Sequence, residues 1–155
     1  MSNTRIHLGH AAIITPDLDR LRSFYQHALG LEVVAEDTPP VSGCTRLAAF
    51  SDGRSVALLA FEKPDAEPAM PQPMGERGLI DHLTFVVGDA DSFSEAVARL
   101  VETGASTGEV QPIGPTLSVG FTDPDGRPVN LQRPNPEWDP ASIGADHGIL
   151  DLIAG

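Results

Sequence analysis

Residues 9–30 change from a strand-like to a helix-like pattern of apolar positions. The short apolar run Ala11–Ile14 favours a strand. Thr15 or Asp17 is expected to cap the helix that follows, and Gly30 to end it in a left-handed conformation. Between these signals, apolar residues recur every three or four positions, as in a helix that packs against a sheet: Leu18, Leu21, Phe24, Tyr25 and Ala28.

The same pattern returns 72 residues later without a gap. Ser92 and Glu95 have the spacing of a capping box, and Gly104 is expected to end the second helix. Further along, an Asp-Gly pair in each copy predicts a tight turn between two strands, here with an offset of 73 residues. Three polar residues of the first copy superpose on three of the second: His10, Asp17 and Asp19 on His82, Asp89 and Asp91.

This repeat predicts an α+β fold made of two tandem βαβββ modules. Two copies are too few for a stacked array, so we expect the modules to close on each other in one shared, curved, barrel-like mixed sheet with a ligand cleft. The whole chain is then a single domain, residues 1–155, divided into module one (6–62), a proline-rich linker (63–78), module two (79–133) and a C-terminal tail (134–155).

Composition and charge narrow the class of protein. Ten Lys and Arg against 22 Asp and Glu give a net charge of −12, which disfavours nucleic acid and anionic membranes as partners. With 41% hydrophobic residues and no run of 18 apolar positions, the chain is expected to be globular, without a membrane span. The N-terminus lacks the pattern of a secretory signal, and the single Cys44 cannot form an internal disulfide. We therefore expect a cytoplasmic protein.

The duplicated His near the start of each first strand, together with Phe-Thr-Asp-Pro-Asp-Gly-Arg-Pro-Val-Asn-Leu at residues 121–131, resembles the vicinal oxygen chelate superfamily. That group includes glyoxalase I, extradiol dioxygenases, fosfomycin resistance enzymes and bleomycin resistance proteins. The resemblance covers residues 6–133 and implies a divalent metal (Fe, Mn, Ni or Zn) held by His, Gln or Glu on the first and last strands of each module. The corresponding positions here are His10, Ala57, His82 and Asn130.

Of these four positions, the two histidines match the superfamily pattern. Asn130 offers an uncharged carbonyl oxygen as a weak third metal ligand, and Ala57 offers none. Two imidazoles leave the charge of a divalent ion uncompensated, and a carboxamide does not act as a general base near neutral pH. His10 and His82 therefore have two interpretations, as metal ligands or as polar groups that line a ligand cavity.

Other candidate residues carry weaker signals. Strand alternation would place His7 on the face opposite His10, and Asp81 on the face opposite His82. His27 and His147 have no counterpart in the repeat. The segment 35–43 is either an exposed connection or a loop over the cleft. The tail carries residues expected to pack on the core or on a partner subunit: Trp138, Ile149, Leu150, Leu152 and Ile153.

The first functional hypothesis is a small-molecule binding protein of the bleomycin-resistance kind, which holds a drug or secondary metabolite in the cleft of a homodimer. It follows from the missing carboxylates at Ala57 and Asn130. The alternative is a divergent metal-dependent lyase, isomerase or dioxygenase that uses His10 and His82. A third hypothesis is an interaction scaffold whose cavity is filled by its own side chains.

Overall fold

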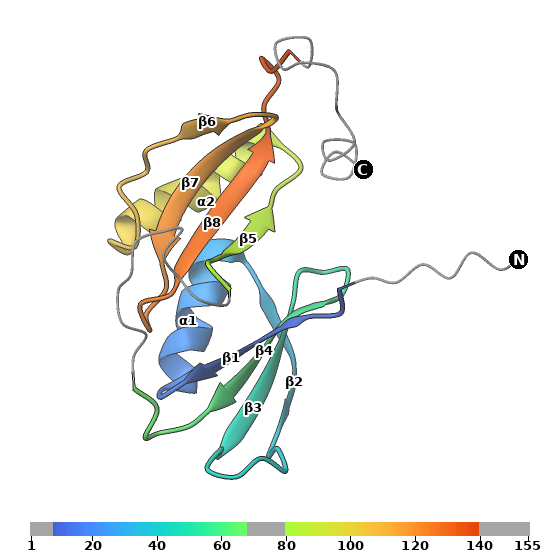
Figure 1. Cartoon of the computed structure of the whole chain (residues 1–155), viewed down its shortest axis with the longest axis vertical. Helices are drawn as coiled ribbons and strands as arrows, with labels where there is room; N and C mark the ends of the chain where they lie inside the picture. Colours follow the sequence, from blue (N-terminus) through green and yellow to red (C-terminus); the bar gives the residue numbers. More distant parts are fainter. Residues whose placement is uncertain (1–7, 68–79, 140–155) are drawn as a thin grey trace, which may run out of the picture. The chain divides into compact units, whose positions relative to one another are not determined.

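The computed structural model describes residues 8–67 and 80–139. The chain divides into two compact units, Met1–Met70 and Pro71–Gly155, and the division falls within the predicted linker. The first unit contains β1 (Ala11–Thr15), α1 (Leu18–Leu29), β2 (Glu32–Asp37), β3 (Arg46–Ser51) and β4 (Val56–Glu62). The second contains β5 (Leu83–Val86), α2 (Ala90–Glu102), β6 (Gln111–Ile113), β7 (Thr116–Thr122) and β8 (Pro128–Pro134) (Figure 1).

Each unit is one βαβββ module with its own four-stranded mixed sheet. The strand orders are β1-β4-β3-β2 and β5-β8-β7-β6. In each sheet the first and last strands of the module pair in parallel, and the remaining neighbours pair antiparallel. The predicted α+β fold of two tandem modules is confirmed. The predicted single shared, barrel-like sheet does not form over the described ranges. The strands form two separate sheets, because the last strand of each module pairs with the first strand of the same module.

The helix ends follow the sequence signals closely. Asp17 caps α1, its carboxylate accepting a hydrogen bond from the backbone N–H of Arg20 at 2.9 Å, while Thr15 donates its hydroxyl to the carbonyl of Asp17. Asp89, not Ser92, caps α2 and accepts from the N–H of Ser92 at 2.8 Å. Gly30 has φ +69° at the C-terminus of α1, a conformation that costs glycine little.

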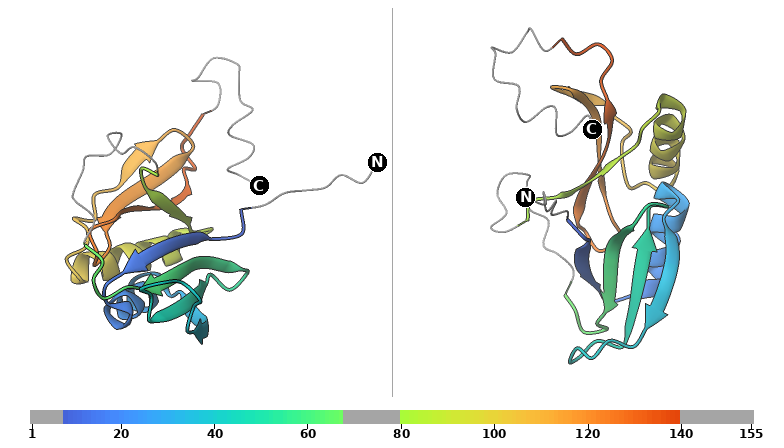
Figure 2. Two further views of the ribbon diagram at one scale, coloured as in Figure 1. Left: turned by 60° about the horizontal axis from the view of Figure 1, so that its bottom comes forward. Right: turned by 90° about the vertical axis from the view of Figure 1, so that its right-hand side faces the viewer.

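Each helix covers one face of its own sheet (Figure 2). In the first module, α1 packs against β3 and β4, and the rings of Tyr25 and Phe50 lie 6.1 Å apart. In the second, Arg133 of β8 lies over the ring of Phe93 on α2, at 5.7 Å from its centroid. The core of the first module includes Leu18, Leu21, Tyr25, Ala28, Phe50, Leu58 and Ala60; that of the second includes Phe93, Ala96, Leu100, Val119, Phe121, Val129 and Leu131.

Several predictions fall partly or wholly outside the described residues. His7, most of the linker, His147 and the apolar residues 149–153 of the tail belong to this group. Within the described ranges, no helix has the length and hydropathy needed to cross a membrane. The described part of the tail contains a partly buried Trp138 whose backbone N–H donates to the carbonyl of Asn135.

Candidate functional site

Each sheet has a second face that its helix does not cover, which we call the helix-free face. Strand register and alternation assign residues to it, since directly paired residues share a face and successive residues alternate. In the first module this face carries Ala12, Ile14, Ala35, Asp37, Leu47, Ala49, Leu59 and Phe61. In the second module it carries Thr84, Val86, Gln111, Ile113, Thr116, Ser118, Gly120, Thr122, Pro128, Asn130, Gln132 and Pro134.

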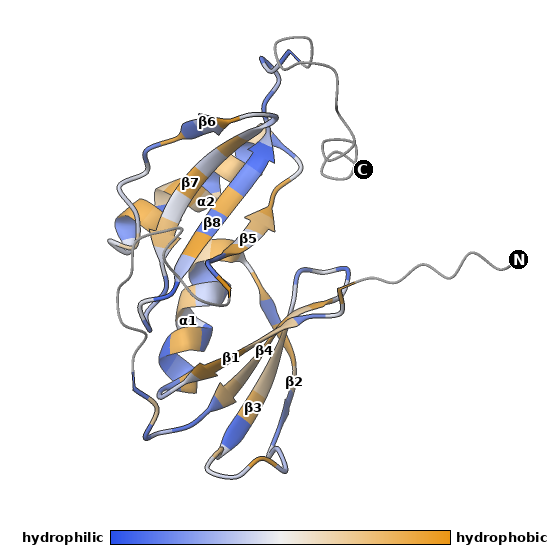
Figure 3. Ribbon diagram, in the orientation of Figure 1, coloured by the Kyte–Doolittle hydropathy of each residue, from blue (hydrophilic) through white to orange (hydrophobic). Residues whose placement is uncertain are grey.

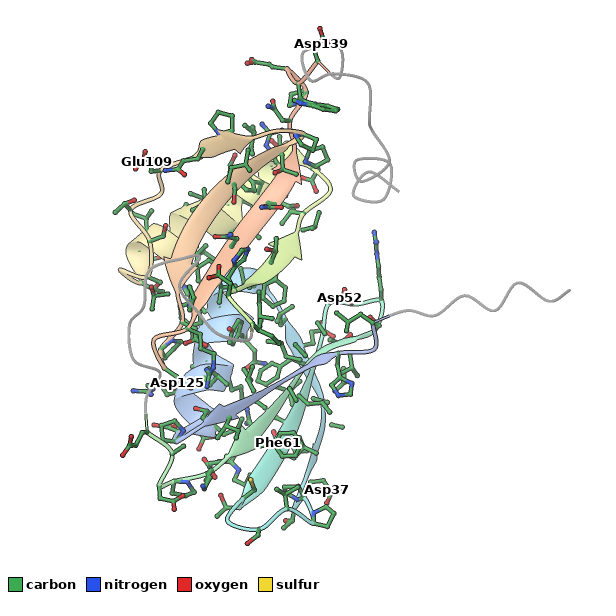
Figure 4. All side chains as sticks on the ribbon, viewed as in Figure 1. Asp37, Asp52, Phe61, Glu109, Asp125 and Asp139 are labelled. Atoms are coloured by element: carbon green, nitrogen blue, oxygen red, sulfur yellow. The ribbon has the colours of Figure 1, made fainter. Side chains whose placement is uncertain are left out.

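The two helix-free faces differ in chemistry. The residues of the first face are almost all apolar, and those of the second face are mostly hydroxyl and carboxamide side chains. Figure 3 reflects this difference: β1 and β4 are coloured mainly toward the hydrophobic end, whereas β8 alternates between hydrophobic and hydrophilic residues. Phe61, labelled on β4 in Figure 4, is a large apolar side chain of the first face.

The strand register changes one predicted equivalence. Ala12 pairs with Leu59, and its counterpart Thr84 pairs with Asn130. Leu59 is therefore the structural counterpart of Asn130, at an offset of 71 residues, in place of Ala57. Ala57 lies where the β3–β4 register shifts, between the pairs formed by Val56 and Leu58. That Ala57 contacts a ligand stays a prediction.

The cause of this shift is the different position of the Asp-Gly pair in the two turns. Phe50 pairs with Leu58, and Phe121 pairs with Val129, so the strands themselves repeat at 71 residues. Gly53 and Gly126 both have positive φ, but Gly126 stands further along its turn than Gly53 does. An alignment based on the Asp-Gly pairs therefore matches β4 to β8 with an error of two residues.

His10 and His82 occupy equivalent positions, each one residue before the first strand of its module. His10 lies two residues before Ala12, which pairs with Leu59, and His82 lies two residues before Thr84, which pairs with Asn130. Two residues span about 6.5 Å along a strand. His10 is exposed and His82 is partly buried. The structure places them alike within their modules, and their convergence on one point stays a prediction.

Asp81 lies in direct contact with His82, contrary to the prediction from strand alternation. Its Oδ2 atom is 2.7 Å from Nδ1 of the imidazole. Alternation fails here because β5 begins at Leu83, so neither Asp81 nor His82 is a strand residue. A carboxylate on Nδ1 holds the imidazole in one orientation and, when the ring is neutral, favours Nε2 as the free acceptor. Sequence reasoning missed this contact, although the two residues are adjacent.

Asn130 is 5% exposed, and its carboxamide makes no side-chain hydrogen bond within the described ranges. It pairs across the strands with Gly120, where an added Cβ would stand 3.5 Å from Oδ1 of Asn130. On the same face, Nε2 of Gln132 donates to Oγ of the buried Ser118 at 3.3 Å. Thus the carboxamide of Asn130 has no protein partner but is not among the buried unpaired polar atoms, so it keeps contact with solvent, while Gln132 is oriented by a neighbour.

The donor set is sparse for a resident metal ion. The described residues contain no group of three or more His, Cys, Asp and Glu side chains that would hold one. Leu59 has no donor atom, and Asn130 supplies neutral atoms where a carboxylate would offset the charge of the ion. The Asp81–His82 pair does fit, since metal-binding histidines commonly donate their second nitrogen to a carboxylate.

The Asp-Pro-Asp-Gly-Arg turn between β7 and β8 holds a buried ion-pair cluster. Arg127 donates to Asp123 at 2.8 Å and to Asp125 at 3.0 Å, and both carboxylate side chains are almost fully buried. Burial lowers the pKa of Arg127, but attraction to the two carboxylates raises it by more, so the guanidinium stays charged. These charges hold the turn that precedes β8, the strand that carries Asn130; Figure 4 labels Asp125 in this turn.

Three other features named from the sequence lie within the described residues: His27, the segment 35–43 and Cys44. His27 lies in the last turn of α1, where a cation interacts favourably with the helix dipole. The segment 35–43 begins as strand, since β2 extends to Asp37, and only its remainder is a connection. Cys44 is partly buried, and its backbone N–H donates to the carbonyl of Val41. Neither His27 nor Cys44 lies on a helix-free face.

The arrangement of two βαβββ modules matches a known family. The family model of the glyoxalase/bleomycin resistance protein/dioxygenase superfamily aligns with residues 7–131. The chain belongs to this superfamily. This membership confirms the resemblance drawn from the paired histidines and the Asp-Pro-Asp-Gly segment, because the superfamily includes the glyoxalases, bleomycin resistance proteins and dioxygenases named there.

Individual proteins are similar to this chain over most of their length. The uncharacterized protein YwkD of Bacillus subtilis (strain 168) is 33% identical over 127 residues, which cover 80% of this chain and 94% of that protein. A glyoxylase/bleomycin resistance protein/dioxygenase domain from Frankia sp. EAN1pec has a TM-score of 0.70 at 17% identity, covering 85% and 100% of the two chains. The fosfomycin resistance protein FosX of Listeria monocytogenes, complexed with Mn(II) and sulfate, has a TM-score of 0.60 at 19% identity, covering 86% and 97%.

Proposed function

We propose that this superfamily member binds a small organic molecule, a drug or a secondary metabolite, against the helix-free faces of its paired modules without the usual carboxylate metal ligand. The observation that carries the proposal is the pair of residues at equivalent positions of the last strands. These are Leu59 and Asn130, neither of which has a charge. A carboxylate at such a position would serve a metal ion, whereas an apolar and a carboxamide side chain serve an organic ligand.

If one ligand contacts both faces, as we propose, the chemistry of each face calls for an organic molecule with an apolar part and a polar part. Leu59, Phe61 and their neighbours offer apolar contact, and Ser118, Asn130 and Gln132 offer hydrogen bonds. Ligand sites are commonly lined by apolar side chains with a few placed polar groups. The superfamily description also includes bleomycin resistance proteins, whose name records an organic drug.

Isothermal titration calorimetry against a panel of drug-like and secondary-metabolite compounds tests the proposal. We expect saturable binding of at least one compound and weaker binding by Asn130→Leu and Leu59→Ser. The matched control is Thr107→Ala, a change in the loop after α2 that leaves both helix-free faces intact. Absence of binding across the panel, combined with turnover of any compound, would contradict a binding function.

A second candidate function is a divergent metal-dependent lyase, isomerase or dioxygenase that uses His10 and His82. The 2.7 Å contact between Asp81 and His82 favours it, because the carboxylate presents the second ring nitrogen of His82 as a ligand. A bound divalent ion (Fe, Mn, Ni or Zn) would polarise an oxygen of the substrate. Within this candidate, His82 and His10 bind the ion, Asp81 orients His82, and Asn130 is a weak third ligand.

Metal analysis of protein purified without chelators separates the two functions. Stoichiometric metal that is lost in both His10→Ala and His82→Ala supports the enzyme, and His27→Ala serves as a control because His27 lies on α1. Failure to bind Fe, Mn, Ni or Zn after reconstitution would rule out the enzyme and leave the binding function standing.

The proposal also includes a homodimer in the cytoplasm, with no nucleic acid and no membrane as partner. The net charge of −12 supports the exclusion of polyanions. Sedimentation equilibrium tests the oligomeric state: we expect twice the chain mass of 16.4 kDa. A mass that stays at one chain over the accessible concentrations would contradict the dimer.

A further inference from the structure

We infer that the helix-free face of the second module is a neutral hydrogen-bonding subsite, in which Asn130 binds an uncharged amide-like group of the ligand. This inference rests on the proposed function and specifies the chemical class of the ligand. It starts from a polar side chain that is nearly buried and unpaired: Asn130 is 5% exposed and makes no side-chain hydrogen bond over the described ranges. The polar atoms of this carboxamide are not among the buried unpaired atoms of the described residues, so they keep contact with solvent, and a ligand can replace their hydrogen bonds to water with its own.

The surroundings of Asn130 leave its carboxamide accessible from the sheet surface. Its cross-strand neighbour is Gly120, which has no side chain to cover the oxygen atom. Its parallel-strand neighbour is Thr84, which is exposed and short. Both neighbours therefore allow a planar group to approach the carboxamide at the sheet surface.

Gln132 and Ser118 extend this subsite along β8 and β7. Gln132 is two residues from Asn130 and on the same face, a separation of about 6.5 Å. Because Nε2 of Gln132 donates to Oγ of Ser118 at 3.3 Å, its carbonyl oxygen is held as an acceptor. The subsite thus offers a carboxamide with both a donor and an acceptor at Asn130, and an oriented acceptor at Gln132.

The absence of formal charge on this face selects the ligand. The residues that register assigns to it in β5 to β8 are all uncharged within the described ranges: Thr84, Val86, Gln111, Ile113, Thr116, Ser118, Gly120, Thr122, Pro128, Asn130, Gln132 and Pro134. An anionic group finds no Lys or Arg here, and a cationic group finds no carboxylate on the face. Asp81, which precedes β5, is engaged by His82. A charged group therefore gains no ion pair with the residues of this face, whereas a neutral polar group finds hydrogen-bond partners.

A primary amide, lactam or carbamoyl group matches these donors and acceptors. Such a group presents an N–H and a C=O side by side, and the Asn130 carboxamide presents the complementary pair. Two hydrogen bonds then form without any change of protonation.

The test uses three probes of similar shape and different charge: benzamide, benzoate and benzylamine. Each is titrated into the ¹⁵N-labelled full chain while the side-chain NH₂ signals of Asn130 and Gln132 are followed by NMR. We expect benzamide to shift the Asn130 signal saturably and to bind about tenfold more tightly than the other two. Asn130→Leu should abolish the benzamide effect at Gln132, and Asn130→Asp should reverse the order in favour of benzylamine. Unchanged thermal unfolding of both variants verifies that they fold.

The outcomes separate this inference from the proposed function. If benzoate or benzylamine shifts Asn130 as strongly as benzamide does, or if the probes perturb Leu59 and Phe61 alone, the inference is wrong and the proposed function stands. If none of the probes perturbs either helix-free face, and the compound panel in the calorimeter also fails, both are contradicted. A selective benzamide effect that is lost in Asn130→Leu supports both.

Discussion

Asp81 and His82 form a hydrogen-bonded pair at the entrance to β5, with 2.7 Å between Oδ2 and Nδ1. The contact orients the imidazole at the start of β5, and β5 pairs with β8, the strand that carries Asn130. In the first module the residue before His10 is Gly9, and glycine has no side chain that could contact the imidazole. The two modules therefore present their histidines differently.

The first prediction concerns the tautomer of His82. In the neutral form of the ring, the proton should reside on Nδ1 because Asp81 accepts it. Long-range ¹H–¹⁵N NMR of the imidazole measures this directly. Asp81→Ala should shift His82 toward the other tautomer and leave the exposed His10 unchanged. A tautomer that is the same in both proteins would mean that the Asp81 contact does not form in solution.

A second prediction concerns the ion pairs in the turn before β8. Arg127→Met should leave the buried carboxylates of Asp123 and Asp125 unpaired and lower the free energy of unfolding by about 3 kcal/mol. Arg46→Met is the matched control, because Arg46 contacts three carboxylates, those of Asp19, Glu36 and Glu62, but is itself more exposed than Arg127. Urea unfolding followed by circular dichroism gives both values. Equal losses in the two variants would contradict a special role for burial.

The N-cap of α2 should make stability depend on pH. Hydrogen bonds from the backbone and side chain of Ser92 hold the pKa of Asp89 below its usual value. A lowered folded-state pKa means that this carboxylate stabilises the fold above its unfolded pKa of about 4 and loses that effect as the pH falls through the folded value. Asp89→Asn keeps a capping oxygen without the charge.

We therefore expect wild type to exceed Asp89→Asn in stability at pH 7, and the difference to shrink as the pH falls below about 4. Urea unfolding of both proteins across this range checks the expectation. A difference that is constant, or that grows toward acidic pH, would show that the charge of Asp89 does not contribute.

The corrected register predicts how engineered carboxylates should behave. Asn130→Glu should raise the affinity for Mn(II) by at least about tenfold, or about 1.4 kcal/mol, by supplying the anionic ligand beside His82. In the first module, Leu59→Glu should raise it more than Ala57→Glu, because Leu59 pairs with the strand that follows His10. Mn(II) titrations followed by electron paramagnetic resonance measure all three. A larger effect at Ala57 would contradict the register.

Much of the fold was predictable because local signals agree with the tertiary arrangement. The offset of 72 residues located both helices, and the Asp17 cap and Gly30 end follow from residue types that suit those conformations. The βαβββ order followed from the alternation of strand-like and helix-like patterns. The helix positions, their caps and the order of elements depend on interactions between residues close in sequence, and local residue patterns therefore predict them.

The remaining features depend on contacts that local patterns do not display. Aligning the two Asp-Gly pairs gave the wrong register for the last strands, because the pair stands at different positions within the two turns. The pairing of Phe50 with Leu58 gives the correct register of β4. The Asp81–His82 contact does not follow the rule that successive strand residues alternate between faces, because both residues precede β5, which begins at Leu83. Burial of Asp123 depends on the packing around its turn, so the sequence revealed a turn and not an ion pair.

The most direct test of the account is the electron density of a ligand bound to the crystallised full chain, using the tightest compound from the calorimetric panel. We predict density for an organic molecule on the helix-free face of β8, with a polar group within hydrogen-bonding distance of Asn130. Density for a metal ion ligated by His10 and His82, or a ligand that sits away from both helix-free faces, would contradict the account.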